Sequence, residues 1–539
     1  MLFSLAAATP LRAQSSLTAD AALDSARTAA AADRHDEAIR WYRRAIALQP
    51  SLESEIGVEL GHQYTWADKP DSAVTFYRAY LATHPQDIDA EIGLGRALAW
   101  SGHHKDAIAT YEAALPHAGD RANEVRVGIA RVKSWQDNHE AAYAEYEAVL
   151  ASDPRNLDAL LGRAQVLNWA GRHRDARDAY FDIRNAYPDN ADARQGFAAA
   201  QYWQGRVDLA LATIRGGEQT PAAIALKNEF ERSVSPDASY LYEQNKDTDD
   251  IERRMHTVDA GFYVDELTRI GAQYGHGNFE QPGRPEVSRN WLGAVWRERF
   301  DESWAVNATA GWQWNSFDRD ALGPESFWKD DFDLFTVDGY ATWTPRDWMR
   351  WDFGLFHGSL TNPDAIFRGI SLTELSAGLD YRFRSNLMLA SAAALTFYSD
   401  DNTRVGLDER LVWQPLWKLP TRLNHRFSLT TGLGYFGFSH TRDNGYYDPR
   451  QYLSIYEEGA LDMTLHRRVR GHVSGRIGFD RENGDDWFDV GRFDISGTFV
   501  LHPRFTLTAG YYNSNSRLDS REGYAADGFY VGLDYVHHD

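Results

Sequence analysis

The chain has 539 residues, a formal net charge of −22 and no cysteine. This length exceeds what a single hydrophobic core usually organises, so we expect at least two domains. The absence of cysteine excludes disulfide frameworks and thiolate metal sites. The acidic balance argues against nucleic acid as a partner. Aromatic residues make up 13% of the chain, a high share that is typical of surfaces at a membrane–water interface.

The N-terminus resembles the second half of a secretory signal. A short apolar run precedes Ala13 and a polar stretch, although no basic segment comes before it. We therefore predict that residues 1–13 are the remnant of a signal peptide. No other segment offers the ~20 unbroken apolar residues of a transmembrane helix. If the chain enters a membrane, it does so with strands.

The first part of the chain carries a ladder of tryptophans in steps of about 34 residues, the period of tetratricopeptide repeats. An alanine stands four residues before a tyrosine in each unit, as at Ala73 and Tyr77, and prolines close most units. This pattern predicts about six helix-turn-helix repeats, stacked into a solenoid over residues 14–235. The tryptophans of the ladder are Trp66, Trp100, Trp135, Trp169 and Trp203.

These tryptophans fall near the end of the first helix of each predicted pair, two residues before a turn. Two roles are open for them. The indoles either lock neighbouring repeats together, or they line a groove in which aromatic faces stack on an extended partner, a peptide or a glycan.

From Ser239 onward, segments of about ten residues alternate polar and apolar side chains. We count about sixteen such segments, joined by links that are alternately short and long, as in outer-membrane barrels. An even strand number puts both barrel ends, and with them the repeats, in the periplasm. The sequence thus predicts an α+β multidomain chain: an N-terminal all-α solenoid followed, over residues 236–539, by an antiparallel transmembrane β-barrel. A soluble all-β domain is the alternative.

The alternation also predicts which side chains face the barrel lumen, and acids outnumber bases among them. Charged rings set pore selectivity, so an acidic lumen would repel polyanions and accept a neutral or partly cationic glycan. Alternatively, the charges pair across strands and only hydrate the wall. Inward tyrosines would give sugar rings weak, sliding contacts. The predicted lumen residues are Asp259, Tyr263, Asp338, Tyr340, Asp352, Glu374, Asp380, Arg382, Tyr456, Glu458, Asp462, Arg470, Arg476, Arg492, Asp494, Tyr530 and Asp534.

A further set of aromatic residues falls in a predicted long loop. Tyr446, Tyr447 and Pro449 lie between two strand segments, at the rim with the long links. Two interpretations are open: the loop folds back as a gate, or its rings belong to the aromatic girdle at the membrane surface.

The chain combines a predicted solenoid of Trp-Gly repeats with a barrel that follows it. Its stretch from Gly445 to Leu453 contains Tyr-Tyr-Asp-Pro. In both features the chain resembles the outer-membrane exporters of bacterial exopolysaccharides. These include the cellulose and poly-N-acetylglucosamine secretion proteins, and the YaiO-type outer-membrane barrels are a near relation. The final strand departs from the pattern, because it ends in a polar tail after Tyr535.

This resemblance implies a biofilm-related pore in the bacterial outer membrane that exports an exopolysaccharide chain. The periplasmic repeats would dock polysaccharide synthesis or modification proteins, and the barrel would contact lipid and lipopolysaccharide. The alternative is a non-conducting barrel anchor whose repeats scaffold envelope complexes. We expect no enzymatic activity, cofactor or metal site. His425 and Ser428, which superficially suggest a phospholipase, fall on opposite faces of one strand.

Overall fold

The computed structural model describes residues 18–323, 328–329, 332–415, 424–442, 444–519 and 525–537. The predicted signal remnant lies outside these residues. The chain forms two compact units. The first ends at Arg163, and the second begins at Ala164 and holds the last helices together with the whole barrel.

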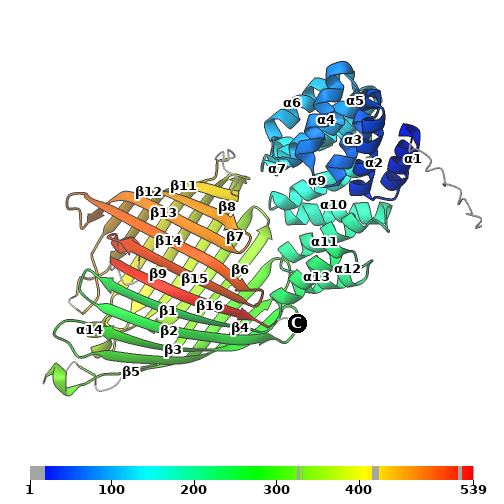
Figure 1. Ribbon diagram of the computed structural model, residues 1–539. Helices are drawn as coiled ribbons and strands as arrows, with labels where there is room; N and C mark the ends of the chain where they lie inside the picture. Colours follow the sequence, from blue (N-terminus) through cyan, green and yellow to red (C-terminus); the bar gives the residue numbers. More distant parts are fainter. Residues whose placement is uncertain are drawn as a thin grey trace, which may run out of the picture. The chain divides into compact units, whose positions relative to one another are not determined.

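The chain up to Ser233 is a succession of helices, as the repeat pattern predicts (Figure 1). The first unit contains α1 (Ala19–Ala31), α2 (His35–Leu48), α3 (Glu53–Trp66), α4 (Pro70–Thr83), α5 (Ile88–Trp100), α6 (His104–Ala114), α7 (Ala122–Trp135) and α8 (His139–Ser152). Helix α9 (Leu157–Trp169) crosses the boundary between the units. The second unit adds α10 (His173–Ala186), α11 (Ala191–Trp203), α12 (Val207–Arg215) and α13 (Pro221–Ser233).

Packing explains the tyrosine and small-residue positions of the repeat. Tyr77 of α4 is fully buried, and its ring lies against the backbone of Gly61 in α3 and of Gly93 in α5. A Cβ atom added at these glycines would come within 2.7 Å and 2.4 Å of that ring. The first helix of a repeat therefore needs a small residue where the tyrosine of a second helix packs, which fixes the spacing of both.

Sixteen antiparallel strands close into a barrel, because β1 pairs with β16 (Figure 1). The strand number and the closure confirm the predicted fold class. The strands are β1 (Asp237–Asp247), β2 (Glu252–Tyr263), β3 (Thr268–Glu280), β4 (Val287–Arg299), β5 (Trp304–Ser316), β6 (Phe332–Arg346), β7 (Met349–Ser359), β8 (Ser371–Arg384), β9 (Leu387–Tyr398), β10 (Thr403–Trp413), β11 (Asn424–Phe438), β12 (Tyr452–His466), β13 (Val469–Glu482), β14 (Phe488–His502), β15 (Phe505–Ser514) and β16 (Ala526–Val536).

The strand register assigns the strand residues to one of two faces, except where four β-bulges shift it near the turns at one end of the barrel. Side chains alternate along a strand, and residues paired across strands share a face. When these pairs are followed from β1 round the ring, they return to the same residues of β1, so the assignment is consistent. One face carries exposed apolar side chains such as Leu292, Phe335, Leu375 and Leu433. An apolar band of this kind is typical of a barrel wall that contacts lipid.

The two ends of the barrel differ in their links, as predicted. Links 347–348, 385–386 and 467–468 are tight turns at one end, the short-turn mouth. Links 360–370 and 439–451 lie at the other end, the long-loop mouth. Strand β3 runs through Gly277 to Glu280, so residues 281–286 form the link to β4 at the long-loop mouth. No helix in the described part of the chain is long and apolar enough to span a bilayer.

Candidate pore and its two mouths

A segment of the long-loop mouth identifies the inner face of the barrel. The link 360–370 contains the short helix α14 (Pro363–Phe367). On one side, Arg253 of β2 donates a hydrogen bond to Thr361 (2.9 Å). On the other side, residues of the same link pack in one cluster with Phe436 of β11. Since β2 and β11 lie across the ring from each other, the link spans the interior, and the face that it touches is the inner one.

All of the predicted lumen residues lie on this inner face. The register pairs them with one another or with other inner residues: Glu458 lies opposite Arg476, and Asp259 lies opposite Gln273. They come from β2, β6, β7, β8, β12, β13, β14 and β16, so they are distributed round the ring. Their contact with a passing ligand stays a prediction.

The inner face is more nearly neutral than the sequence indicated. The predicted set held nine carboxylates and four arginines, an excess of five acids (9 − 4), whereas the register places fifteen carboxylates and thirteen arginines of the described strands on this face, an excess of two (15 − 13). The missed carboxylates are Asp237, Glu243, Asp247, Asp408, Asp480 and Glu482. The missed arginines are Arg253, Arg269, Arg289, Arg297, Arg299, Arg350, Arg404, Arg410 and Arg426. Many of them stand near strand ends, where sequence alternation alone does not fix the face.

Inner charges pair with their neighbours. Arg269 bridges Asp237 at 2.6 Å and Asp259 at 2.5 Å. On the other side of the ring, Arg476 binds Glu458 at 2.9 Å. Cross-strand pairs of this kind stabilise the wall and leave little unbalanced charge at these positions.

The inner tyrosines differ in how they lie. The rings of Tyr456 and Tyr530 lie over Gly432 and Gly510 of the neighbouring strands, where an added Cβ atom would come within 2.1 Å and 2.4 Å of them. Tyr340 is half exposed, with 51% of its surface accessible. Two of the four predicted tyrosine contacts, Tyr456 and Tyr530, are therefore rings laid against the wall, whereas Tyr340 leaves half of its surface open.

Tyr446 of the predicted gating loop lies inside the long-loop mouth. Its ring stacks on Tyr398, an inner residue of β9, with centroids 4.8 Å apart and planes 5° from parallel. Its hydroxyl donates to Asp400 (2.9 Å) and accepts from the amide nitrogen of Asn402 (3.1 Å). Burial raises the pKa of Tyr446 above its ordinary value of 10.0. The phenol therefore stays protonated and keeps donating.

Tyr447 also turns inward, and Pro449 is buried beside the end of β11. The hydroxyl of Tyr447 donates to Glu482 at 2.6 Å, and the guanidinium of Arg517 lies 4.3 Å over its ring. Burial raises the pKa of Tyr447 as well. Pro449 is buried, and its carbonyl accepts a hydrogen bond from the backbone of Phe438 (3.0 Å). The two tyrosines thus contact inner side chains, in contrast to an outer aromatic girdle, and the gating role of Tyr446, Tyr447 and Pro449 stays a prediction.

Helix α14 places a second group of residues, all apolar, inside the long-loop mouth, and the sequence analysis did not predict this. Ile366 and Phe367 are fully buried in a cluster with Phe279 of β3 and Val287 of β4. A signal was present: Asn362, followed by a proline, is a helix start, and its side chain caps the helix. Apolar residues directly after such a start, within a barrel link, indicate a loop that packs inward.

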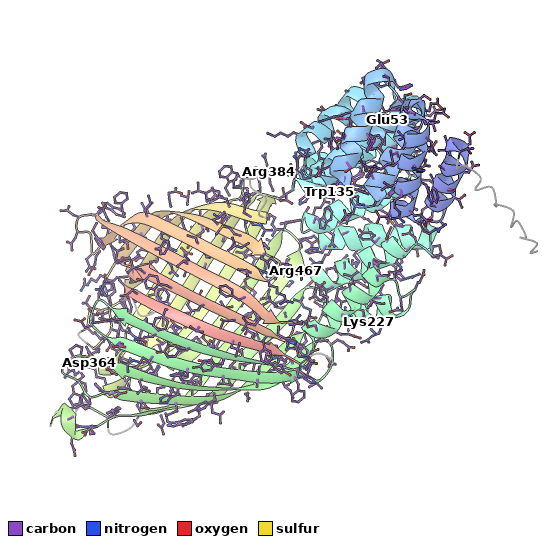
Figure 2. The ribbon with its side chains drawn as sticks, in the orientation of Figure 1. Glu53, Trp135, Lys227, Asp364, Arg384 and Arg467 are labelled. Atoms are coloured by element: carbon purple, nitrogen blue, oxygen red, sulfur yellow. The ribbon has the colours of Figure 1, made fainter. Side chains whose placement is uncertain are left out.

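The two inserted links touch each other. Gly445 has a positive φ of 81°, and a Cβ atom there would come within 2.5 Å of the Cβ of Asp364 and 2.7 Å of the backbone nitrogen of Ala365. Asp364, marked in Figure 2, is also bound by Arg284 at 2.7 Å. We name the described residues of links 360–370 and 439–451 together the plug.

At the short-turn mouth, helix α10 is bound to the turns of the barrel within the second unit. The backbone N–H of Arg174 donates to Asp347 (2.8 Å), so a carboxylate lies at the helix N-terminus. The guanidinium of Arg174 donates to the carbonyls of Thr344 (2.6 Å) and Glu302 (3.0 Å). Burial raises the pKa of Asp347, against the opposing effect of Arg174.

The tryptophans of the ladder are mostly exposed. Trp66, Trp100, Trp169 and Trp203 have 48%, 45%, 45% and 60% of their surface accessible, and Trp135 is half-buried. Histidines partly cover some of them: the ring of His173 stacks on Trp203 with centroids 6.1 Å apart. A purely packing role does not account for this exposure, and their role as a groove stays a prediction.

The described residues contain no cluster of three or more histidine and carboxylate side chains that could hold a metal ion. The strand register puts His425 on the outer face and Ser428 on the inner face of β11, so the histidine is not placed to take a proton from the serine.

Residues 67–127 and 136–189 match the tetratricopeptide repeat family. No curated protein matches the chain. A solved structure titled bacterial polysaccharide outer membrane secretin is 14% identical, with a TM-score of 0.44, over 56% of this chain and 98% of that one. A tetratricopeptide repeat protein from Parabacteroides merdae is 16% identical, with a TM-score of 0.35, over 40% of this chain and 87% of that one. A thermophilic TPR protein of Thermus thermophilus is 20% identical, with a TM-score of 0.30, over 33% of this chain and 97% of that one.

Proposed function

We propose that this chain is an outer-membrane pore that exports an exopolysaccharide. The repeats lie in the periplasm and dock the proteins that synthesise or modify the polymer. The observation that carries the proposal is the composition of the inner face of the closed barrel. This face contains both paired charges and tyrosine rings, and inserted loops fill one of the two mouths. A wall of this kind offers a sugar chain many weak contacts, which conduction requires.

The charge balance favours a neutral polymer, and the small acidic excess on the inner face also admits a partly cationic one. Arg269 and Arg476 on the inner face are both bound to carboxylates, so these two arginines do not offer an unpaired positive charge to a polyanion. Weak selectivity by charge and stronger selectivity by shape follow from this pairing.

Conductance in planar bilayers tests the proposal. Purified full-length protein should give ion currents that rise when the plug is destabilised, and neutral or cationic oligosaccharides should alter these currents. A barrel that never conducts, even with the plug trimmed, contradicts export.

A second test uses the charge count of the inner face. Replacing Asp380, Asp462 and Asp494 with asparagine leaves twelve carboxylates (15 − 3) against thirteen arginines. Cation selectivity should therefore vanish. Selectivity that is unchanged would show that these residues do not line the conducting path.

The alternative function is a non-conducting anchor whose repeats scaffold envelope complexes. The buried apolar part of the plug favours it, because Ile366 and Phe367 are packed as in a stable core. A chain that pulls down the same envelope partners with and without its plug, and that never conducts, would support this alternative.

A further inference from the structure

The turns after the ladder tryptophans share one backbone conformation. Two residues after each tryptophan the chain has a positive φ: 57° at Asp68, 80° at Gly102, 59° at Asp137, 73° at Gly171 and 78° at Gly205. Aspartate occupies two of these five positions, and aspartate tolerates this conformation better than most residues do. The backbone alone therefore does not explain why the last two positions are glycine.

The surroundings of the last two glycines differ from those of the earlier turn. A Cβ atom at Gly205 would come within 2.1 Å of the Nε of Arg299, and one at Gly171 within 2.6 Å of a terminal nitrogen of Arg382. At Gly102 the same atom would meet nothing within 4 Å. The absence of a side chain thus allows an arginine to lie against the turn, most closely at Gly205.

Both arginines belong to the inner face of the barrel at the short-turn mouth. Arg299 ends β4, and Arg382 stands near the end of β8. The guanidinium of Arg299 donates to the carbonyl of Gln204 at 3.2 Å, the residue between Trp203 and Gly205. All of these residues lie in the second unit. The last two Trp-x-Gly turns are therefore docked on the inner edge of the mouth.

The indoles next to these docked turns remain accessible. Trp169 and Trp203 keep 45% and 60% of their surface exposed. Each lies two residues from a glycine that carries a guanidinium of the pore wall. Exposed aromatic faces beside hydrogen-bond donors suit the two surfaces of a sugar ring, its C–H face and its hydroxyl edge.

We infer that Trp169 and Trp203, with Arg299 and Arg382, form an entrance site for a neutral or weakly cationic polysaccharide chain at the short-turn mouth. This inference rests on the proposed pore function and says where the polymer first contacts the protein, namely at the short-turn mouth. The indoles stack on successive sugar rings, and the arginines donate to hydroxyls where the chain enters the barrel. Trp100 has the same motif and the same exposure of 45%, without a rim arginine at Gly102.

Calorimetry on the detergent-solubilised full chain tests the site without requiring conduction. The probes are cellohexaose and the glucosamine hexamer of the same linkage. Wild type should bind at least one of them. The double variant Trp169→Ala/Trp203→Ala should bind about tenfold more weakly, which corresponds to about 1.4 kcal/mol. The control Trp100→Ala should bind as wild type.

Three results would overturn the inference: wild type that binds neither hexamer, a double variant that binds as wild type, or a control that loses as much affinity as the double variant. The conductance measurement judges the pore proposal separately, so failure of the entrance site and failure of export are distinguishable.

A second pair of variants tests the docking that positions the site. Gly205→Asn should displace Arg299 and weaken oligosaccharide binding although both indoles are intact. Gly102→Asn introduces the same side chain in the same conformation at an open position and should leave binding unchanged. Equal binding by Gly205→Asn and wild type would show that the arginine does not position the entrance.

Discussion

Different forces hold the residues at the two mouths of the barrel. At the long-loop mouth, Ile366 and Phe367 are fully buried among inner apolar residues. At the short-turn mouth, Arg174 and Arg299 hold helices by hydrogen bonds to turn carbonyls and carboxylates, and indoles remain exposed. Opening the first mouth requires apolar surface to leave a packed core, whereas the second mouth can exchange its polar contacts with water. We therefore expect the long-loop mouth to be the regulated one and the short-turn mouth to be permanently accessible.

The largest predicted effect comes from removing the apolar half of the plug. Ile366→Ala with Phe367→Ala should destabilise the closed state by several kcal/mol, since a buried phenylalanine alone contributes about 3–5 kcal/mol. Single-channel conductance and the fraction of time in the open state should both rise. The matched control is Ile477→Ala on the outer face of β13, whose side chain is 74% exposed. Equal closed times in the plug variant and wild type would contradict a packed closure.

At the opposite mouth, Arg174→Ala should release helix α10 from the turns that carry Thr344 and Glu302. Hydrogen bonds to charged groups contribute about 1.5–3 kcal/mol each, so the linkage should weaken clearly. Limited proteolysis between residues 164 and 235 should become faster while plug gating stays unchanged. Arg172→Ala removes a local ion pair with Asp175 and serves as the control. Faster gating in Arg174→Ala would show that the two mouths are coupled.

A smaller effect is expected from the polar half of the plug. Tyr446→Phe keeps the ring stacked on Tyr398 but removes the hydroxyl contacts to Asp400 and Asn402. The closed state should lose about 1 kcal/mol, which appears as more frequent brief openings. Tyr435→Phe, on the outer face of β11, should leave the current trace unchanged. If Tyr446→Phe opened the pore as much as the apolar double variant, hydrogen bonds would outweigh packing.

The smallest effect concerns the pH dependence of thermal stability, and it is confined to the helices at the short-turn mouth. Burial lowers the pKa of His173 below its ordinary value of 6.5, although nearby Asp347 opposes this and Arg382 adds to it. Because the pKa of His173 is lower in the folded state than in the unfolded state, the folded state is favoured by the neutral imidazole. This contribution to folding stability is fully present above pH 6.5 and is lost as the pH falls through the folded-state pKa. Thermal unfolding of the helical part should therefore shift downward between about pH 7.5 and about pH 5.5. His173→Gln should reduce the shift, and an equal shift in this variant would exclude His173.

The barrel was predictable because its signal is local. Alternation along each strand assigned Asp338 and Tyr340 to the inner face, and the closed register agrees. The same rule did not place Arg253 and Arg289, whose positions near strand ends depend on where each strand begins. The residues that were predicted to face inward do so, but the total charge of the inner face was misjudged because fifteen of its charged residues were missed.

The contacts across the ring were not predictable from alternation. The inward fold of α14 depends on Phe279 and Phe436, which lie far from it in the chain. In the same way, Gly171 and Gly205 have the sequence appearance of ordinary turn glycines. Only the position of Arg299 and Arg382 shows that a second requirement, close approach, acts on them.

The difference between the aspartate turns and the glycine turns has a consequence for how such a chain can grow. A whole repeat inserted among those with Asp68, Gly102 or Asp137 adds length to the solenoid and leaves Gly171 and Gly205 against their arginines. A repeat inserted between Trp169 and Trp203 separates the two docked turns and misaligns one of them. Gene duplication is therefore free to lengthen the solenoid before Ala164, while the spacing of the last two units is fixed by the two arginines against which their turns lie.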